Sequence, residues 1–277
     1  MLTRRTFHKL ALALIHSRFH GVQLGVQSYS FRDMPLDRAL DAMRQIGIGE
    51  CELYMGHAEP QDLKGEALRH WRLTVPLSYF QEIRGKFDKA GVELGAYSLN
   101  FRDNFSDDEL SRGFEMTKAL GTDIITTSTT LTCAERLAPL AEKYRVRVAM
   151  HGHDETDKPN EFSTPASFAR ALGMSPFFYI NLDIGHFSAA GFDPVSYIRA
   201  QHAKILTLHI KDRRKNHGPA VPFGQGDTPI REVLLLLEKE RYPIPANIEY
   251  EYNDDHPDLD TVTEVRRCFN YCKQILA

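Results

Sequence analysis

The feature that most limits the fold of this chain is a regular alternation of short β-branched runs with longer amphipathic stretches. Eight runs from Val22 onward are typical of strands, and most have an amphipathic stretch between them and the next. Strands that alternate with helices pair in parallel as βαβ units. The predicted strands cover residues 22–28, 50–54, 92–97, 123–127, 146–150, 178–183, 205–209 and 247–251.

The stretches between these runs carry the signals of helices. Residues 36–46 place apolar side chains at i, i+3 and i+4 spacing, which predicts an amphipathic helix. Ser106 stands three residues before Glu109, a capping-box pattern that predicts the start of a helix over residues 109–120. Further helices are predicted over residues 231–239 and 259–276.

Eight strand–helix units without a break in composition predict one closed (β/α)8 TIM barrel over residues 21–277. The alternative is an open, doubly wound sheet, which usually carries a glycine-rich phosphate turn after its first strand. Here the first strand leads into Gln27-Ser28-Tyr29-Ser30-Phe31-Arg32, which contains no glycine. The sequence therefore favours the barrel as a single domain.

The first twenty residues resemble a bacterial twin-arginine export leader, because Arg4 and Arg5 precede Phe7 and an apolar stretch over residues 10–15. That stretch is shorter than the roughly 7–15 residues typical of the apolar region of a signal peptide. No A-x-A cleavage site follows it. We expect a leader over residues 1–20 and export to the periplasm. The alternative is an uncleaved basic amphipathic helix on a cytoplasmic protein.

Charge and hydrophobicity exclude several classes of partner. The 34 Lys and Arg residues against 37 Asp and Glu residues give a net charge of −3, which offers no footprint for nucleic acid. No apolar run approaches the roughly 18 residues that a membrane-spanning helix needs. The four cysteines lack zinc-like CxxC pairing, so we expect buried or helix-face thiols.

Four consecutive predicted strands end in histidine or a carboxylate. In a TIM barrel these ends meet at one rim, where the active site lies. Alternation along each strand points one such side chain per strand inward: His151, Asp183, His209 and Glu249. Two imidazoles and two carboxylates predict one divalent metal ion, with Mn²⁺, Co²⁺, Zn²⁺ or Fe²⁺ preferred over Ca²⁺.

A second set of polar residues stands two positions further along the same strands, nearer the mouth. His153, Lys211 and Glu251 belong to it. We expect His153 and Lys211 to take part in catalysis beside Glu249, and Glu251 to contact the substrate or to replace Glu249 as ligand if the register shifts.

Three further residues are candidates at the rim. Glu52 is expected to bind sugar hydroxyls, or alternatively to pair with a basic side chain inside the barrel. Arg213, like Lys211, is expected to hold an anionic group of the substrate, although no glycine-rich cradle indicates a phosphorylated one. Asp212 is expected to pair with a nearby Arg or Lys.

Several short motifs together give the chain a resemblance to the xylose-isomerase-like barrel superfamily of sugar phosphate isomerases and epimerases. Its relatives include ketose 3-epimerases, inosose dehydratases and endonuclease IV. The motifs are L-D-x-G-H at 182–186, H-I-K-D at 209–212, G-x-G-D at 224–227 and I-E-Y-E at 248–251. The resemblance covers nearly the whole chain from Gly21. It implies Asp183, His209 and Glu249 as metal ligands and His186 as a substrate-contacting, catalytic histidine.

The fifth strand departs from the epimerase pattern, because His151 stands where those enzymes carry a glutamate ligand. Two-base epimerisation uses that glutamate, and a histidine held on a metal has no free lone pair to replace it. Either His153 or Glu155 supplies the second base, or the reaction needs one base, as in isomerisation or β-elimination.

The resulting hypothesis is a metal-dependent enzyme that acts on a sugar, keto-sugar or polyol through a metal-stabilised enediolate. It would be isomerase- or epimerase-like, or a lyase on 3-keto-glycosides. The alternatives are a nuclease of the endonuclease IV kind and a non-catalytic sugar-binding barrel. A nuclease would need more ligands and a basic surface, and inward charges are costly unless they bind something.

Overall fold

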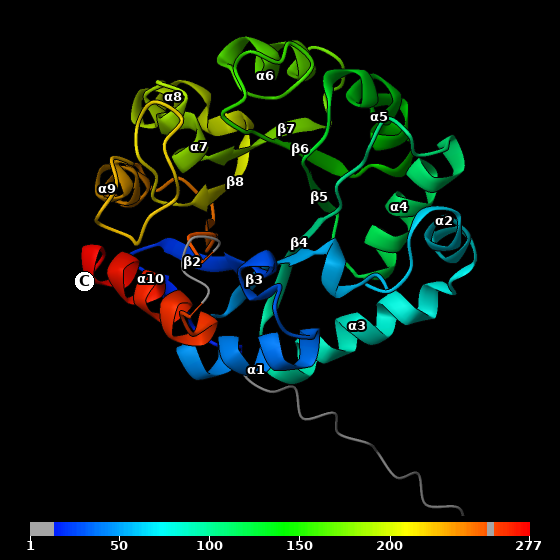
Figure 1. Cartoon of the computed structure of the whole chain (residues 1–277), viewed down its shortest axis with the longest axis horizontal. Coiled ribbons are helices and arrows are strands. Elements are labelled where there is room, and N and C mark those ends of the chain that lie inside the picture. The colour runs from blue at the N-terminus through cyan, green and yellow to red at the C-terminus, as the bar shows by residue number, and fades with distance from the viewer. Residues whose placement is uncertain (1–13, 254–257) are drawn as a thin grey trace, which may run out of the picture.

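The computed structural model describes residues 14–253 and 258–277 and shows a closed TIM barrel (Figure 1). Eight strands pair in parallel in chain order, and the last pairs with the first, so the sheet closes on itself. The predicted fold class is therefore confirmed. The barrel strands are β2 (Val22–Gln27), β3 (Glu50–Tyr54), β4 (Glu93–Ser98), β5 (Ile124–Thr127), β6 (Arg147–His151), β7 (Phe178–Asp183), β8 (Ile205–Ile210) and β9 (Ala246–Ile248).

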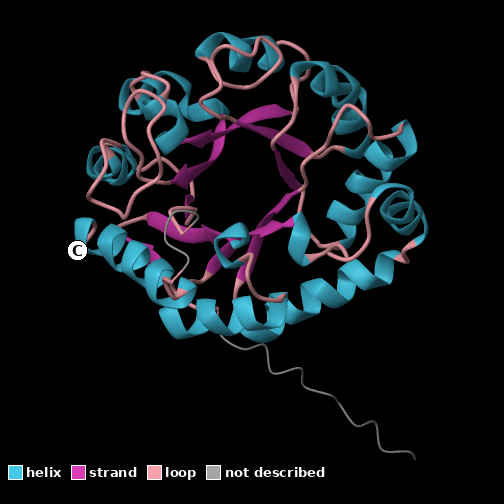
Figure 2. Ribbon diagram, in the orientation of Figure 1, coloured by secondary structure: helices cyan, strands magenta, loops and turns pink. Residues whose placement is uncertain are grey.

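Helices surround this barrel as an outer ring (Figure 2). They are α1 (Leu36–Ile46), α2 (Gly65–Thr74), α3 (Leu77–Ala90), α4 (Asp107–Ala119), α5 (Leu131–Tyr144), α6 (Pro165–Leu172), α7 (Ile184–Ala189), α8 (Pro194–Gln201), α9 (Ile230–Glu240) and α10 (Thr261–Ile275). The predicted capping box is present at α4, where Ser106 Oγ accepts from the Glu109 N–H and Glu109 Oε2 accepts from the Ser106 N–H. Each bond satisfies a backbone donor that the first turn leaves free.

The predicted strand bounds hold to within a few residues, with the largest change in β9. This strand ends at Ile248, three residues before the predicted end. The backbone N–H of Glu249 still donates to the Ile210 carbonyl at 3.0 Å, so Glu249 remains fixed against β8. Although β9 is short, it therefore still positions Glu249.

The segment just before the first barrel strand packs against the barrel. Arg18–Phe19 form a short strand, β1, antiparallel to the start of β2. The buried Ser17 hydroxyl donates to the Leu24 carbonyl at 2.7 Å and accepts from the Gly49 N–H at 2.9 Å. The twin-arginine pattern at Arg4 and Arg5 lies outside the described residues.

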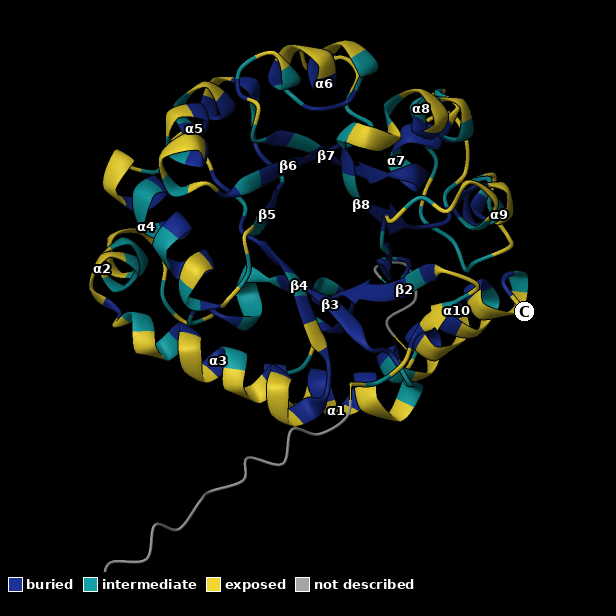
Figure 3. Ribbon diagram, turned by 180° about the vertical axis from the view of Figure 1, so that it is seen from behind, coloured by how far each residue is buried: buried dark blue, intermediate teal, exposed yellow. Residues whose placement is uncertain are grey.

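The barrel strands are mostly buried, whereas the outer faces of the helices are exposed, as the dark and bright colours of Figure 3 show. All four cysteines are free and buried, as expected from the sequence: Cys51, Cys133, Cys268 and Cys272. Within residues 14–253 and 258–277, no helix combines the length and apolar character needed to cross a membrane.

Strand register brings the inward polar side chains of the second half to one height. His151 pairs with Asn181, Asp183 pairs with His209, and His209 in turn pairs with Asn247. Because side chains alternate along a strand, residues at these positions face the same interior. Four neighbouring strands thus direct their polar ends to one point.

Candidate metal centre and active site

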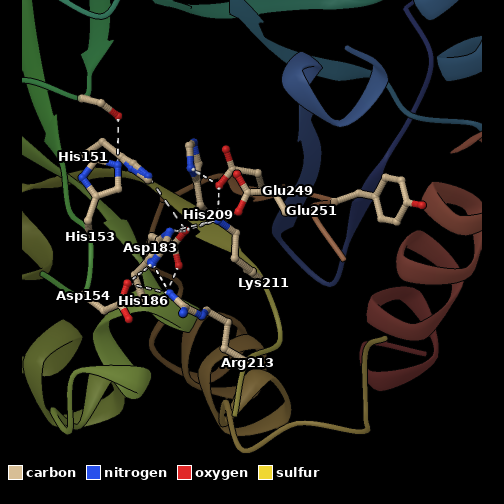
Figure 4. Close-up of polar contacts among 12 residues, drawn as sticks. His151, His153, Asp154, Asp183, His186, His209, Lys211, Arg213, Glu249 and Glu251 are labelled. Atoms are coloured by element: carbon tan, nitrogen blue, oxygen red, sulfur yellow. Dashed lines mark hydrogen bonds and ion pairs between the residues drawn. The ribbon is translucent and has the colours of Figure 1, made fainter. Parts of the chain in front are cut away.

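The four predicted ligands converge at the carboxyl-terminal end of the barrel. His151, Asp183, His209 and Glu249 each offer one ligand atom, and these atoms all lie within 4.8 Å of one another (Figure 4). All four side chains are buried. This buried cluster is consistent with a divalent metal ion, the donor mixture being suited to Zn²⁺, Mn²⁺, Co²⁺ or Fe²⁺.

A bound metal ion would supply the partner that the ring of His151 lacks. Its Nδ1 is buried without a hydrogen-bond partner among the described residues, and its Nε2 lies 3.9 Å from Asp183 Oδ2, beyond hydrogen-bond range. Burial, reinforced by the charge of His209, holds the pKa of His151 well below its ordinary value. The neutral ring therefore keeps a lone pair, which is the form that ligates metals.

Asp183 serves two purposes at the end of β7. Its Oδ1 accepts a 2.7 Å hydrogen bond from the backbone N–H of His186 and so caps helix α7. Its Oδ2 is buried without a hydrogen-bond partner and lies 3.1 Å from the Lys211 ammonium. One oxygen thus fixes the side chain, and the other faces the cluster.

His209 lies between two carboxylates. Its Nδ1 is 3.1 Å from Glu249 Oε2, and its Nε2 is 3.0 Å from Glu52 Oε1. Burial alone would lower the pKa of His209, but these two carboxylates raise it well above its ordinary value. Nδ1 faces the candidate ligands, whereas Glu52, itself held by the Thr126 hydroxyl at 2.6 Å, fixes the ring from behind.

Lys211 reaches deeper than its sequence position suggests. Its side chain is 2% exposed, and its Nζ lies 3.1 Å from Asp183 Oδ2 and 2.9 Å from Glu249 Oε2, with Glu251 as a third partner. Burial would lower the pKa of Lys211, but these carboxylates raise it well above its usual value. The residue is therefore an ammonium at the level of the candidate ligands, not at the mouth.

His186 is held in one orientation by Asp154. His186 Nδ1 lies 3.0 Å from Asp154 Oδ1, and Lys211 Nζ lies 3.2 Å from His186 Nε2. The Arg213 guanidinium also contacts Nδ1, so one carboxylate and two cations fix the orientation of the ring. Burial would raise the pKa of Asp154, but its hydrogen bonds to His186 and Arg213 hold it well below its ordinary value.

A cavity of about 410 Å³ opens above the cluster. This volume suits a small-molecule ligand. Burial, with the charges of His186 and Lys211, lowers the pKa of His153 to about 4, so its ring is neutral at physiological pH. The lining residues are Gln27, Tyr29, Tyr54, Ser98, Asn100, Arg102, Ser128, His151, His153, Asn181, His186, His209, Lys211, Glu249 and Glu251.

The other predicted substrate contacts are placed differently. Glu52 is fully buried beneath the cluster and pairs with His209, which matches the second of the two interpretations that its position allowed. Arg213 donates to Asp154 at 2.7 Å and to the Gly218 carbonyl, and does not line the cavity. Glu251 lines the cavity and holds Lys211.

The prediction for Asp212 is wrong. Its carboxylate accepts backbone N–H groups of Gly224 at 2.8 Å, Gly226 at 2.9 Å and Thr228 at 3.2 Å, and no Arg or Lys of the described chain pairs with it. A Cβ on Gly226 would lie 2.0 Å from Asp212 Oδ1, which explains this glycine of the G-x-G-D motif. Asp212 therefore organises the loop between β8 and α9.

Two supporting residues were missed at the sequence level. Asp154 directly follows His153 at the end of the fifth barrel strand, so its place beside two histidines was a usable signal. Asn181, whose amide lies 3.0 Å from His209 Nε2, shares an inward face with Asp183. Neither position indicated which histidine of a neighbouring strand the side chain would contact.

Comparisons with known proteins agree with this geometry. A sequence model of the xylose isomerase-like TIM barrel family matches residues 40–272. L-ribulose-5-phosphate 3-epimerase UlaE of Salmonella paratyphi A is 30% identical over 112 residues, which are 40% of this chain and 38% of the relative. The match therefore spans well under half the length of this curated relative.

Solved structures share the fold at low identity. The probable 3-DHS dehydratase AsbF of Bacillus anthracis has a TM-score of 0.68 at 15% identity, covering 91% of this chain and 99% of that chain. The IOLI protein, solved with a binding zinc atom, has a TM-score of 0.68 at 16% identity, covering 92% of this chain and 98% of that chain.

Proposed function

This chain belongs to the xylose isomerase-like TIM barrel family, and we propose that it is a metal-dependent enzyme acting on a sugar, keto-sugar or polyol. The reaction begins with removal of a proton from a carbon next to a carbonyl. Relatives named as a sugar-phosphate epimerase and a probable dehydratase, and one with zinc bound, support this class.

The observation that carries the proposal is the convergence of four buried ligand atoms within 4.8 Å, one from the end of each of four consecutive strands. His151, Asp183, His209 and Glu249 would hold the ion. A divalent ion bound there supplies a Lewis acid that polarises a carbonyl and its adjacent hydroxyl. Lys211 and His209 pair with the two carboxylates of this cluster in the structure, which offsets part of the cost of burying them.

Glu249 is the residue that we assign as base. Burial would raise the pKa of Glu249, but His209 and Lys211 lower it well below its ordinary value, so it is ionised at neutral pH. The Lys211 ammonium, fixed by Glu249 and Glu251, is placed to donate a hydrogen bond to a substrate oxygen. His186, whose Nε2 lies 3.2 Å from Lys211 Nζ, can take up or return a proton on the same side.

The histidine at the fifth strand favours a reaction that needs one base. His151 belongs to the candidate ligand set, so its lone pair is committed when the site is filled. His153 is neutral and lines the cavity, which makes it the residue that would supply a second base if epimerisation occurs. We therefore place aldose–ketose isomerisation and β-elimination from 3-keto-glycosides ahead of 3-epimerisation of free ketoses.

Metal content tests the first half of the proposal. The wild-type protein should contain close to one equivalent of a transition metal, measured by elemental analysis, and His209→Ala should lose it. His70→Ala is the matched control, because His70 is exposed on α2. Full occupancy in His209→Ala would show that the ion binds elsewhere.

Substrate assays test the second half. The metal-loaded protein is incubated with free ketohexoses and, separately, with 3-keto-glycosides. Release of an aglycone, or aldose formation without C3 epimers, would support the one-base ordering. Fast interconversion of C3 epimers with intact 3-keto-glycosides would reverse it and assign the second base to His153 or Glu155.

A further inference from the structure

The cavity is lined by an arginine whose guanidinium has no direct polar partner among the described residues. Two cationic side chains line it, Lys211 and Arg102. Lys211 is surrounded by three carboxylates, as described above. The guanidinium of Arg102, an exposed residue, makes neither a hydrogen bond nor an ion pair with any described residue, although it lines the same cavity.

The acidic neighbour of Arg102 in the chain is already engaged. Asp103 accepts hydrogen bonds from the hydroxyls of Thr130 and Thr132, each at 2.8 Å. Two other arginines near the mouth are engaged: the Arg213 guanidinium is paired with Asp154, and the Arg32 guanidinium donates to the Tyr250 carbonyl. Arg102 is thus the guanidinium whose donors remain available to a ligand in the cavity.

The position of Arg102 places this charge opposite the candidate metal centre. Arg102 follows β4, and β4 stands four strands from β8 in the closed eight-stranded barrel, so the two strands lie on opposite sides. The lining residues from β2 to β5 are otherwise neutral: Gln27, Tyr29, Tyr54, Ser98, Asn100 and Ser128. The carboxylates that line the cavity, Glu249 and Glu251, follow β9 on the other half.

We propose that Arg102 is a specificity-determining residue that binds an anionic group, carboxylate or phosphate, at the end of the substrate remote from the reacting carbonyl. This inference rests on the proposed function and narrows its substrate to acidic keto-sugars. A guanidinium offers paired donors that match the oxygens of either anion. The neutral polar wall around it would contact the hydroxyls between the anion and the carbonyl.

Three ketoses that differ only at C6 test the proposal: D-fructose, D-fructose 6-phosphate and D-fructuronate. Their affinities for the metal-loaded wild type are measured by calorimetry. At least one of the two anions should bind about 10- to 100-fold more tightly than D-fructose, the range expected for a charged hydrogen bond. Whichever anion is preferred identifies the group as phosphate or carboxylate.

Variants of Arg102 test whether this side chain causes the preference for the anionic ketose. Arg102→Gln should remove it by weakening the anion about 10- to 100-fold while leaving D-fructose within about twofold, and Arg102→Lys should retain part of it. Arg44→Gln, which removes the same charge from the exposed face of α1, should leave it intact. Three outcomes would overturn the proposal. These are equal affinities for the three ketoses, no measurable binding of any of them, and an anion preference that survives in Arg102→Gln.

Metal uptake and proton exchange separate this inference from the proposed function. Elemental analysis reports whether the site binds an ion, and exchange of the D-fructose C1 and C3 protons with solvent deuterium reports enolisation. Uptake and exchange without a charge preference would refute the role of Arg102 alone. Absence of both would refute the proposed function itself.

Discussion

Glu50, on the floor of the barrel, should make the protein less stable as the pH rises, and Glu50→Gln should remove that dependence. Glu50 Oε2 and Asn247 Oδ1 are buried without hydrogen-bond partners, and a Cβ on Gly25 would lie 1.8 and 2.1 Å from them. The Asn247 amide nitrogen already donates to Thr207 Oγ1 at 3.0 Å. A proton on Glu50 would let the two oxygens share one hydrogen bond.

The charges around Glu50 favour this protonated form. Burial, and then the carboxylates of Glu52 and Glu93, raise the pKa of Glu50 well above its ordinary value. The unfolded chain loses this proton near pH 4.5, whereas the folded protein keeps it to a higher pH. The folded state therefore binds more protons in this interval, and stability falls as the pH rises through it.

The size of the effect follows from one proton. Between the unfolded and folded pKa values, the free energy of unfolding should fall by about 1.4 kcal/mol per pH unit through Glu50 alone. Below that interval the carboxyl is protonated in both states, and its contribution is constant. The glutamine amide can donate to Asn247 Oδ1 without titrating, so Glu50→Gln should lack this slope.

Urea unfolding at a series of pH values, in the presence of a chelator, measures the difference between the two proteins. The gap in unfolding free energy should widen in favour of Glu50→Gln as the pH rises above about 5. Glu82→Gln, at an exposed carboxylate on α3 away from Glu50, serves as control. Parallel pH profiles for wild type and Glu50→Gln would refute the reasoning.

The remaining predictions concern the site and its loop. Glu52→Gln should weaken Zn²⁺ binding about 10- to 100-fold in calorimetry, because Glu52 fixes His209; unchanged affinity would contradict that role. Asp154→Asn should leave metal content unchanged and lower kcat roughly 10- to 100-fold by releasing His186; loss of the metal instead would point to a structural effect. Gly226→Ala should lower the free energy of unfolding by about 1–3 kcal/mol, because the added Cβ meets a carboxylate oxygen at 2.0 Å; an unchanged melting temperature would count against it.

The fold and the candidate ligands could be predicted because they depend on periodicity. Strand ends in a closed parallel barrel meet at one rim, and alternation selects which side chain at each end points inward. His151, Asp183, His209 and Glu249 needed no further information to be brought together. Extra features with a weaker pattern, such as helix α2, were not predicted.

Contacts that depend on distant partners or flexible side chains could not be predicted in this way. Lys211 extends down from the mouth because a long side chain reaches the carboxylates below it. Glu52 meets His209 across the barrel, 157 positions away in the chain. Asp212 binds backbone amides, and no residue pattern predicts such a contact. Arg102 lies in a loop, and the strand pattern does not determine the path of that loop.

The four buried thiols give this barrel an internal reporter of its own opening. Cys51 lies in β3, Cys133 in α5, and Cys268 and Cys272 in α10, and each is at most 1% exposed. Burial raises the pKa of each thiol, so a disulfide reagent in solution meets neither an accessible sulfur nor a thiolate. Modification of a thiol therefore requires local or global unfolding. The labelling rate at each cysteine measures how often the surrounding part of the structure opens.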